Sequence, residues 1–175
     1  EEQAAEARTR MSQEPRLSAW LSTLENAYWL GFTPDQHTWH GREIAAHLES
    51  KDRYRVAARH DLQRGTTEVL VLGEDRPGLF ASLAGVFATA GANVADARVF
   101  TTRNGKALDI FAVQDGNGAP FGRDDENRLD RLLTALRTAL SGEIHTGPTV
   151  APLREGSKVK RAAAFAIQPW VAIDN

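Results

Sequence analysis

Residues 73–79, with the sequence GEDRPGL, form the stretch best suited to binding a small ligand. They follow a β-branched and leucine run that predicts a strand, and they precede an apolar stripe that predicts a helix. The first N–H groups of such a helix lack backbone partners and can bind an anion such as a carboxylate. Arg76 is a poor helix cap, which leaves those donors free, and Gly78 lets a ligand approach the backbone closely. The candidate ligand-binding residues of this loop are Asp75, Arg76, Pro77, Gly78 and Leu79.

A second polar group that could contact the same ligand is Asn93, which follows Gly91-Ala92 at the start of a predicted strand. Its amide could bond the polar groups of an amino acid. The alternative is a plain tight turn at residues 73–79, with Asn93 only capping the start of its strand. We expect a bound amino acid to lie between the loop and Asn93, with its carboxylate on the helix N–H groups near Gly78 and Leu79.

The remaining polar residues give little support for catalysis or metal binding. His60 and Asp61 form a single His-Asp pair, without the further His and Asp ligands that a phosphohydrolase metal site needs. His40 and Glu43 are three residues apart on a predicted helix, but no cysteine and no third clustered histidine completes a zinc site. We therefore predict no catalytic residue, no metal site and no cofactor in this chain.

Helical and strand patterns alternate around the ligand loop. Apolar residues recur at helical spacing in residues 17–28, 34–48, 77–90 and 123–140. Strand patterns occupy residues 54–60 and 67–72, two further strands flank Asn104-Gly105, and an edge strand is expected at 162–173. From residue 67 the order is strand, helix, strand, strand, helix, strand. This order predicts an α+β, ferredoxin-like βαββαβ fold with two helices on one face of an antiparallel sheet.

The predicted elements divide the chain into two parts. Residues 1–62 are expected to form a helical segment with one strand. Residues 66–175 are expected to form the ferredoxin-like domain, with its core at 67–142. Because the first residue is Glu and the last follows an apolar stretch with no closing element, we expect the chain to be a fragment.

The dipeptide Asn104-Gly105 predicts a two-residue hairpin loop, since both residues tolerate positive φ. That loop would place Arg103 opposite Lys106 and Val99 opposite Ile110, with small apolar side chains under the helices. Arg98 and Asp109 would then be diagonal neighbours on the other face. The alternatives for that face are an ordinary solvated surface or an interface with another domain or subunit. The candidate interface residues are Asp96, Arg98, Phe100, Asp109, Phe111 and Val113.

Composition restricts the partners. The net charge of −2 points neither to nucleic acid nor to an anionic membrane, and no run is long enough to span a membrane. The absence of cysteine excludes disulfides and thiolate chemistry and is typical of a reducing cytoplasm, where we expect the protein to be.

The motifs DRPGL at 75–79 and GANV at 91–94 resemble the signature of the ACT domain family. The longer string GANVADAR at 91–98, followed by Thr101-Thr102, Gly105, ALD at 107–109 and VQD at 113–115, is more specific. It is similar to the first ACT domain of the bifunctional protein-PII uridylyltransferase/uridylyl-removing enzymes. YWLGF at 28–32 resembles the segment between the HD domain and the ACT pair of that family, and residues 165–175 resemble the stretch leading to its second ACT domain.

This resemblance implies a regulatory, glutamine-sensing ACT domain from an enzyme that uridylylates the signalling protein PII at low glutamine and deuridylylates it at high glutamine. The parent enzyme would need Mg²⁺, but its nucleotidyltransferase motif and paired His/Asp residues are not in this sequence. Expected partners are glutamine, a second ACT domain or second copy, and PII through the parent enzyme. The alternative is an ACT interaction or dimerisation module of another enzyme or of a transcriptional regulator, although no DNA-recognition helix is visible.

Overall fold

The computed structural model describes residues 15–142. Three helices come first: α2 (Pro15–Leu21), α3 (Asn26–Gly31) and α4 (Pro34–Glu49). They are followed by strands β1 (Tyr54–Asp61) and β2 (Thr66–Glu74), helix α5 (Leu79–Thr89), strands β3 (Asn93–Thr101) and β4 (Lys106–Gln114), and helix α6 (Glu126–Ser141). The expected α+β class, with an antiparallel sheet and helices, is confirmed. The expected last strand at 162–173 lies outside the described residues.

The sheet contains four antiparallel-paired strands in the order β1-β2-β4-β3. β1 lies beside β2 and is paired with it from Tyr54↔Gly73 to Asp61↔Thr66. The strand predicted in the N-terminal segment is therefore part of the same sheet as the first strand of the βαββ core. β2 and β3 are both antiparallel to β4, so they run in the same direction, and α5 connects the end of one to the start of the other.

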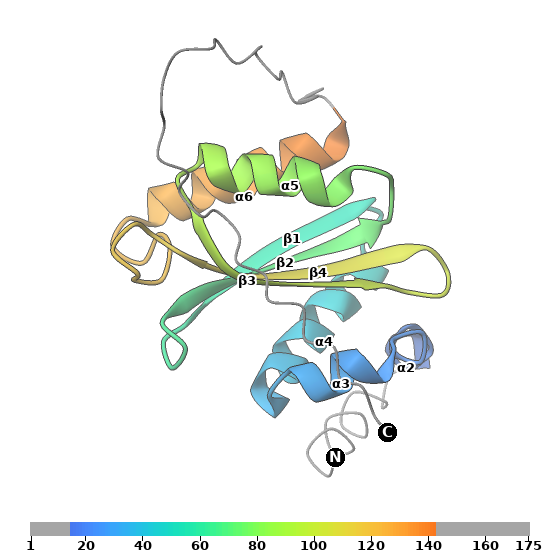
Figure 1. Cartoon of the computed structure of the whole chain (residues 1–175). Coiled ribbons are helices and arrows are strands. Elements are labelled where there is room, and N and C mark those ends of the chain that lie inside the picture. Colours follow the sequence, from blue (N-terminus) through green and yellow to red (C-terminus); the bar gives the residue numbers. More distant parts are fainter. Residues whose placement is uncertain (1–14, 143–175) are drawn as a thin grey trace, which may run out of the picture.

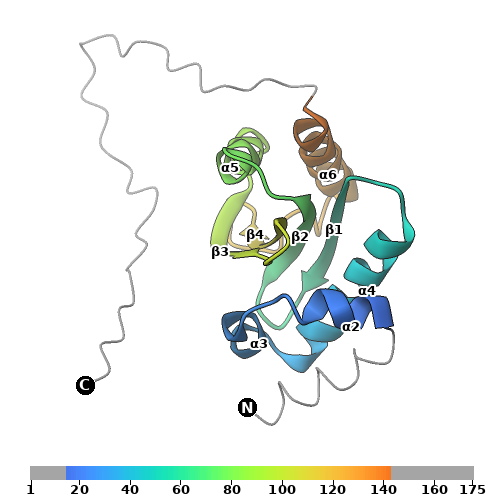
Figure 2. The same cartoon turned by 90° about the vertical axis from the view of Figure 1, so that its right-hand side faces the viewer.

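The sheet is covered on both faces, as Figures 1 and 2 show. Helices α5 and α6 cover one face and α2, α3 and α4 lie against the other. β2 is accordingly apolar on both sides: Val69 and Val71 pack in the cluster beneath α5 and α6, whereas Leu70 and Leu72 pack in the cluster with the N-terminal helices. An unbroken apolar run is the pattern expected of a strand buried on both faces.

Local signals account for the ends of the helices. Thr33 and Gln36 form a capping box at the start of α4, with Pro34 in the first turn. Asp125 caps α6 through the N–H of Asn127, and Gly142 ends that helix in the left-handed conformation. The predicted helix at 17–28 is instead two short helices, α2 and α3, with turns between them.

The predicted register of the β3–β4 hairpin is wrong by one residue. The N–H of Thr102 donates to the carbonyl of Lys106 at 2.7 Å, which closes a loop of three residues, 103–105. A two-residue type I′ loop needs positive φ at both of its residues, but within residues 15–142 only glycines have positive φ, and Asn104 does not. Thr101 therefore lies opposite Ala107, and Val99 lies opposite Asp109.

Because strand side chains alternate, the shift separates the six candidate interface residues. Asp109, Phe111 and Val113 lie on the face under α5 and α6, whereas Asp96, Arg98 and Phe100 lie on the face of the N-terminal helices. Arg98 pairs with Asp96 at 3.1 Å and donates to the carbonyl of Gly31, so the expected contact with Asp109 is not formed.

Both phenylalanines have internal partners. Phe100 packs against Tyr28 and Phe32, with ring centroids 5.4 and 5.9 Å apart, and Phe111 packs against Phe87 at 4.7 Å. The expectation that these two rings need a second copy or another domain to cover them is therefore wrong. The N-terminal helices contribute much of the cover.

Candidate ligand site

The loop between β2 and α5 is held at both of its ends. The N–H of Asp75 donates to the carbonyl of Gly105 at 3.0 Å, and Thr101 Oγ1 donates to Asp75 Oδ2 at 3.2 Å. Both contacts tie the loop to the β3–β4 hairpin. At the other end, the N–H of Leu79 donates to the carbonyl of Arg76 at 3.1 Å, and Leu79 is buried.

Helix α5 begins without a side-chain cap. Its N-cap is Gly78, which has φ of +78° and ψ of 3°, a left-handed conformation that glycine adopts without strain. No side chain accepts a hydrogen bond from the first turn at this position. The N–H of Leu79, which was expected to be free for a ligand, is taken by the carbonyl of Arg76. The helix dipole and the other N–H groups of the first turn offer a weakly positive end next to exposed Pro77 and Gly78, suited to a carboxylate.

Arg76 has a different role from the one its sequence position suggests. Its guanidinium donates to the carbonyl of Ala139 at 2.9 Å, in the last turn of α6. Favourable interaction with the negative end of that helix ties the loop to α6. Arg76 is therefore engaged within the protein and joins the ligand loop to the second helix of the layer.

Asp109 is a buried carboxyl on the same side of the sheet. It is 1% exposed, its Oδ1 has no hydrogen-bond partner, and its sheet neighbours are Val71 and Val99. Burial, and next the negative charge of Asp75, raises the pKa of Asp109 to about 7. Sequence reasoning assigned Asp109 to the opposite face because of the hairpin register; the signal available was a lone acid within an apolar strand.

Asn93 does not lie beside the loop. Gly73 near the end of β2 and Thr101 at the end of β3 both lie opposite Ala107 of β4, so these two strand ends are at the same end of the sheet. Asn93 is at the other end of β3, opposite Gln114. Eight residues of strand separate the two levels, which corresponds to about 25 Å. One copy of the domain therefore does not bring Asn93 and the loop into contact with the same small ligand.

A second polar cluster, which sequence reasoning did not identify, lies between α4 and the sheet. Glu68 is 3% exposed and accepts from Gln36 Nε2 at 2.8 Å, from His40 Nε2 at 3.2 Å and from Arg59 Nε at 2.9 Å. Because a carboxylate only accepts, His40 carries its proton on Nε2, and its Nδ1 accepts from Tyr28 Oη at 3.0 Å. Glu68 was detectable as the one charge in the TTEVLVL run.

The electrostatics of this cluster favour an ionised Glu68 beside a neutral His40. Burial alone would raise the pKa of Glu68, but the hydrogen bonds and charges of His40 and Arg59 hold that pKa below its usual value. Burial lowers the pKa of His40, although its bond to Glu68 opposes the effect. Burial, and next the charge of Glu68, raises the pKa of Tyr28. The cluster thus joins α3 and α4 to β2 by a satisfied network.

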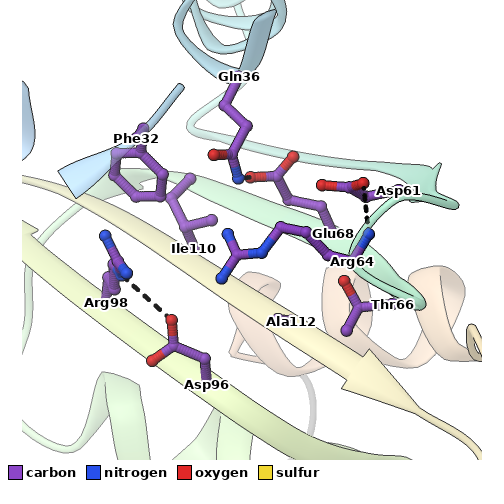
Figure 3. Close-up of a pocket in the computed structure, with 10 residues that line it drawn as sticks. All are labelled: Phe32, Gln36, Asp61, Arg64, Thr66, Glu68, Asp96, Arg98, Ile110 and Ala112. Carbon is purple, nitrogen blue, oxygen red and sulfur yellow. Dashed lines mark hydrogen bonds and ion pairs between the residues drawn. The ribbon is translucent and has the colours of Figure 1, made fainter. Parts of the chain in front are cut away.

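A small pocket adjoins the network, between the α3–α4 corner and the sheet (Figure 3). Its empty volume is about 260 Å³, which includes open solvent. Several of its polar groups bond to one another: Arg98 pairs with Asp96, Gln36 donates to Glu68, and the backbone N–H of Arg64 donates to Asp61 Oδ1 at 3.1 Å.

The histidines considered as metal ligands are each bonded elsewhere. His60 Nδ1 contacts Thr67 Oγ1 at 2.9 Å, His40 contacts Glu68, and Glu43 pairs with Arg55 at 2.7 Å. Within residues 15–142, no three His, Cys, Asp or Glu side chains are grouped to hold a metal ion. No helix in that same part of the chain is long and apolar enough to cross a membrane.

Comparison with known proteins assigns the region of the sheet and the 73–79 loop to a known domain family. Residues 67–120 match the ACT domain family. The chain is 42% identical over 167 residues to the bifunctional uridylyltransferase/uridylyl-removing enzyme of Caulobacter vibrioides, covering 94% of this chain and 17% of that protein. It is 39% identical over 176 residues to the same enzyme of Phenylobacterium zucineum, covering 100% of this chain and 18% of that protein. For the Gluconobacter oxydans enzyme the identity is 36% over 178 residues, covering 99% of this chain and 18% of that protein.

The chain thus spans less than a fifth of the length of the curated relatives that it matches. The match covers the N-terminal helices as well as the sheet. Helices α2, α3 and α4 are therefore part of the segment that this chain shares with these relatives. The chain therefore contains an ACT domain, and over nearly its whole length it is similar to one segment of the bifunctional uridylyltransferase/uridylyl-removing enzymes.

Proposed function

We propose that this chain is the amino-acid-sensing regulatory segment of a bifunctional uridylyltransferase/uridylyl-removing enzyme, with glutamine as the effector and PII as the target of the whole enzyme. The observation that carries the sensing role is the uncapped start of α5 at Gly78, which lies in the segment that matches the ACT domain family. A helix end without a side-chain cap suits the carboxylate of a free amino acid. Catalysis belongs to the rest of the enzyme.

The distance between the loop and Asn93 places a condition on this proposal. If both contact one ligand, Asn93 must come from a second ACT domain or a second copy of the chain, because within one chain they lie at opposite ends of the sheet. The ligand would then sit between two domains and stabilise one arrangement of them. Such a differential contact is what makes a ligand regulatory.

The N-terminal helices supply a route from the sensor to the rest of the enzyme. They contact the sheet through Phe100 and through Glu68, and β2 also leads directly into the ligand loop. A ligand that shifts the loop therefore acts on a strand that is bonded to α4 on its other face. We propose that the α2–α4 layer carries the signal.

Binding calorimetry tests the sensing role. L-glutamine, L-glutamate and L-alanine are titrated into the 175-residue chain, and glutamine should bind most tightly. Asn93→Ala should weaken glutamine binding by about 1–3 kcal/mol, the cost of leaving polar ligand groups unpaired. Asn117→Ala, in the exposed turn after β4, is the matched control and should bind as the wild type does. If no amino acid binds to the wild type, the sensing role is rejected.

An interaction module is the second candidate, because β3 is an edge strand of the sheet that the described residues 15–142 form. Val99 on β3 is 50% exposed and Phe80 on α5 is 43% exposed. Unpaired strand edges with apolar side chains favour pairing with another sheet. A chain that dimerises but binds no amino acid would support this second function over the first.

A further inference from the structure

The outer neighbour of β2 in the sheet comes from the segment that follows α4. β2 lies between β1 and β4, so both of its edges are paired. Helix α4 ends at Glu49 and β1 begins at Tyr54, which leaves residues 50–53 as the connection (Figure 2). Because β1 and β2 are antiparallel, the start of β1 lies beside the end of β2. The segment that follows α4 and the start of the 73–79 loop therefore meet at this place in the sheet.

The closest contact at this place is between Tyr54 and Gly73, which lie opposite each other. A Cβ atom added at Gly73 would overlap Cδ1 of the Tyr54 ring and would lie 2.8 Å from the carbonyl oxygen of Arg53. Glycine within a strand often marks such a close approach of another group. The Tyr54 ring therefore lies directly on the backbone of the residue at which the 73–79 loop begins.

The polar contacts at the same place are weaker. Arg53 Nε donates to Glu74 Oε2 at 2.7 Å, but the two side chains are 66% and 45% exposed, and exposed ion pairs contribute little to stability. The hydroxyl of Tyr54 is buried and has no hydrogen-bond partner within residues 15–142. The contact therefore depends on the aromatic ring, which phenylalanine would supply equally well.

Other contacts join β1 to α4. Glu43 of α4 accepts a hydrogen bond from Arg55 Nε of β1 at 2.7 Å, and these side chains are 17% and 33% exposed. In the connection, the N–H of Ser50 bonds back to the last turn of α4, and Ser50 Oγ accepts from the N–H of Asp52 at 3.2 Å. A displacement of Tyr54 is therefore passed to α4 rather than absorbed by a loose linker.

Close-packed contacts leave no gap in which a displacement can be lost. We propose that Tyr54 is a positioning residue that couples the 73–79 loop to α4, so that a ligand bound at the start of α5 stabilises the C-terminal end of α4. This inference rests on the proposed sensing function. It names the residue through which the ligand loop acts on the N-terminal helices.

Hydrogen exchange of the 175-residue chain, followed by mass spectrometry with and without saturating L-glutamine, tests the coupling. A ligand that holds the loop against Tyr54 makes local opening of the adjoining segment rarer. In the wild type, glutamine should therefore slow exchange at residues 45–53 by about 5-fold or more, the lower end of the usual coupling between two sites.

Two variants at one position and a matched control identify the route. Tyr54→Phe should keep the effect of glutamine, whereas Tyr54→Leu should reduce it to less than about 2-fold, which is below the usual coupling between sites. Saturating ligand ensures that weaker binding does not imitate lost coupling. Phe100→Leu alters a different aromatic contact between the sheet and the N-terminal helices and should keep the effect.

The outcomes separate the two proposals. If the wild type binds no glutamine, the sensing function fails and this inference with it. If glutamine slows exchange at the start of α5 but not at residues 45–53, the sensing function stands and the coupling is overturned. An unchanged effect in Tyr54→Leu, or a lost effect in Tyr54→Phe, overturns the role of the ring. Should Tyr54→Leu fail to fold, the wild type and Tyr54→Phe still decide the outcome.

Discussion

Replacing Glu68 by alanine should weaken the packing of the N-terminal helices on the sheet. The loss in the free energy of unfolding should be larger than for the replacement of a surface residue. Glu68 is the shared acceptor for Gln36, His40 and Arg59, at distances of 2.8 to 3.2 Å. The first two donors are 3% and 0% exposed, so water does not replace the lost acceptor for them. The variant leaves buried donors unpaired in addition to losing an ion pair.

The size of the effect follows from these exposures. Removing one partner of a buried ion pair costs about 3–5 kcal/mol. The lower end applies here, because the Arg59 side chain is 21% exposed and keeps its bond to Asp35 at 2.7 Å. We therefore expect a loss of about 3 kcal/mol in the free energy of unfolding. That is a large share of the stability of a domain of this size, which is about 5–15 kcal/mol.

Urea denaturation followed by far-ultraviolet circular dichroism and by tryptophan fluorescence measures the loss. The control is Glu74→Ala, on the same strand, where the side chain is 45% exposed and pairs with Arg53 at the surface. That change should cost less than about 1 kcal/mol. Equal losses for the two variants would refute the reasoning, because they would show that the buried network adds nothing beyond a surface ion pair.

The pH dependence gives the same prediction a second measurement. The folded pKa of Glu68 is lowered, so the stabilisation that it supplies is present above the unfolded pKa of about 4.3. It is lost as the pH falls through the lowered folded pKa. Acid denaturation of the wild type should therefore include a loss of stability in that window that Glu68→Ala lacks.

Four further outcomes are expected. Asp109→Asn should be more stable than the wild type by about 2–4 kcal/mol at pH 8 in urea melts, with the gap closing towards pH 4, because the raised folded pKa makes the wild type lose stability as pH rises. Gly78→Ala should cost about 1–2 kcal/mol through its positive φ, whereas Gly85→Ala in the open middle of α5 should cost nothing. Phe100→Asp should lower the melting temperature through lost packing on Tyr28 and Phe32, whereas Leu30→Asp, at a 67% exposed site, should not. The purified chain should neither uridylylate nor deuridylylate PII, and any product in a radiolabelled UMP assay would contradict that expectation.

Local sequence patterns predicted most of the helices and strands of this protein. The apolar stripe of α5, the continuous apolar run of β2 and the Thr33-Pro34 start of α4 each report on contacts between residues a few positions apart. Such contacts are set by the helical and strand periods of the chain itself. The motif at residues 75–79 likewise identified a loop before a helix, and the structure has that loop there.

The composition of the candidate site depended on longer-range facts. Asn93 and the loop are joined by α5 in the chain, but the connection crosses the sheet and leaves them at opposite ends. No local pattern reports this separation, because it results from β2 and β3 running in the same direction in one sheet. Sequence reasoning assigned Asp109 to the wrong face of the sheet, because Asn104 does not take the positive φ that a two-residue hairpin loop needs.

What the sequence determined by itself was therefore the order and kind of the elements, the loop at residues 73–79 and the ACT resemblance. Only the tertiary structure decided which strands pair, which face each side chain joins, and that α2, α3 and α4 pack over the second face. The physical reason is that pairing and packing depend on residues far apart in the chain. Glu68 and Gln36 are 32 positions apart in the chain, and only folding brings the Gln36 amide to the Glu68 carboxylate that accepts its hydrogen bond.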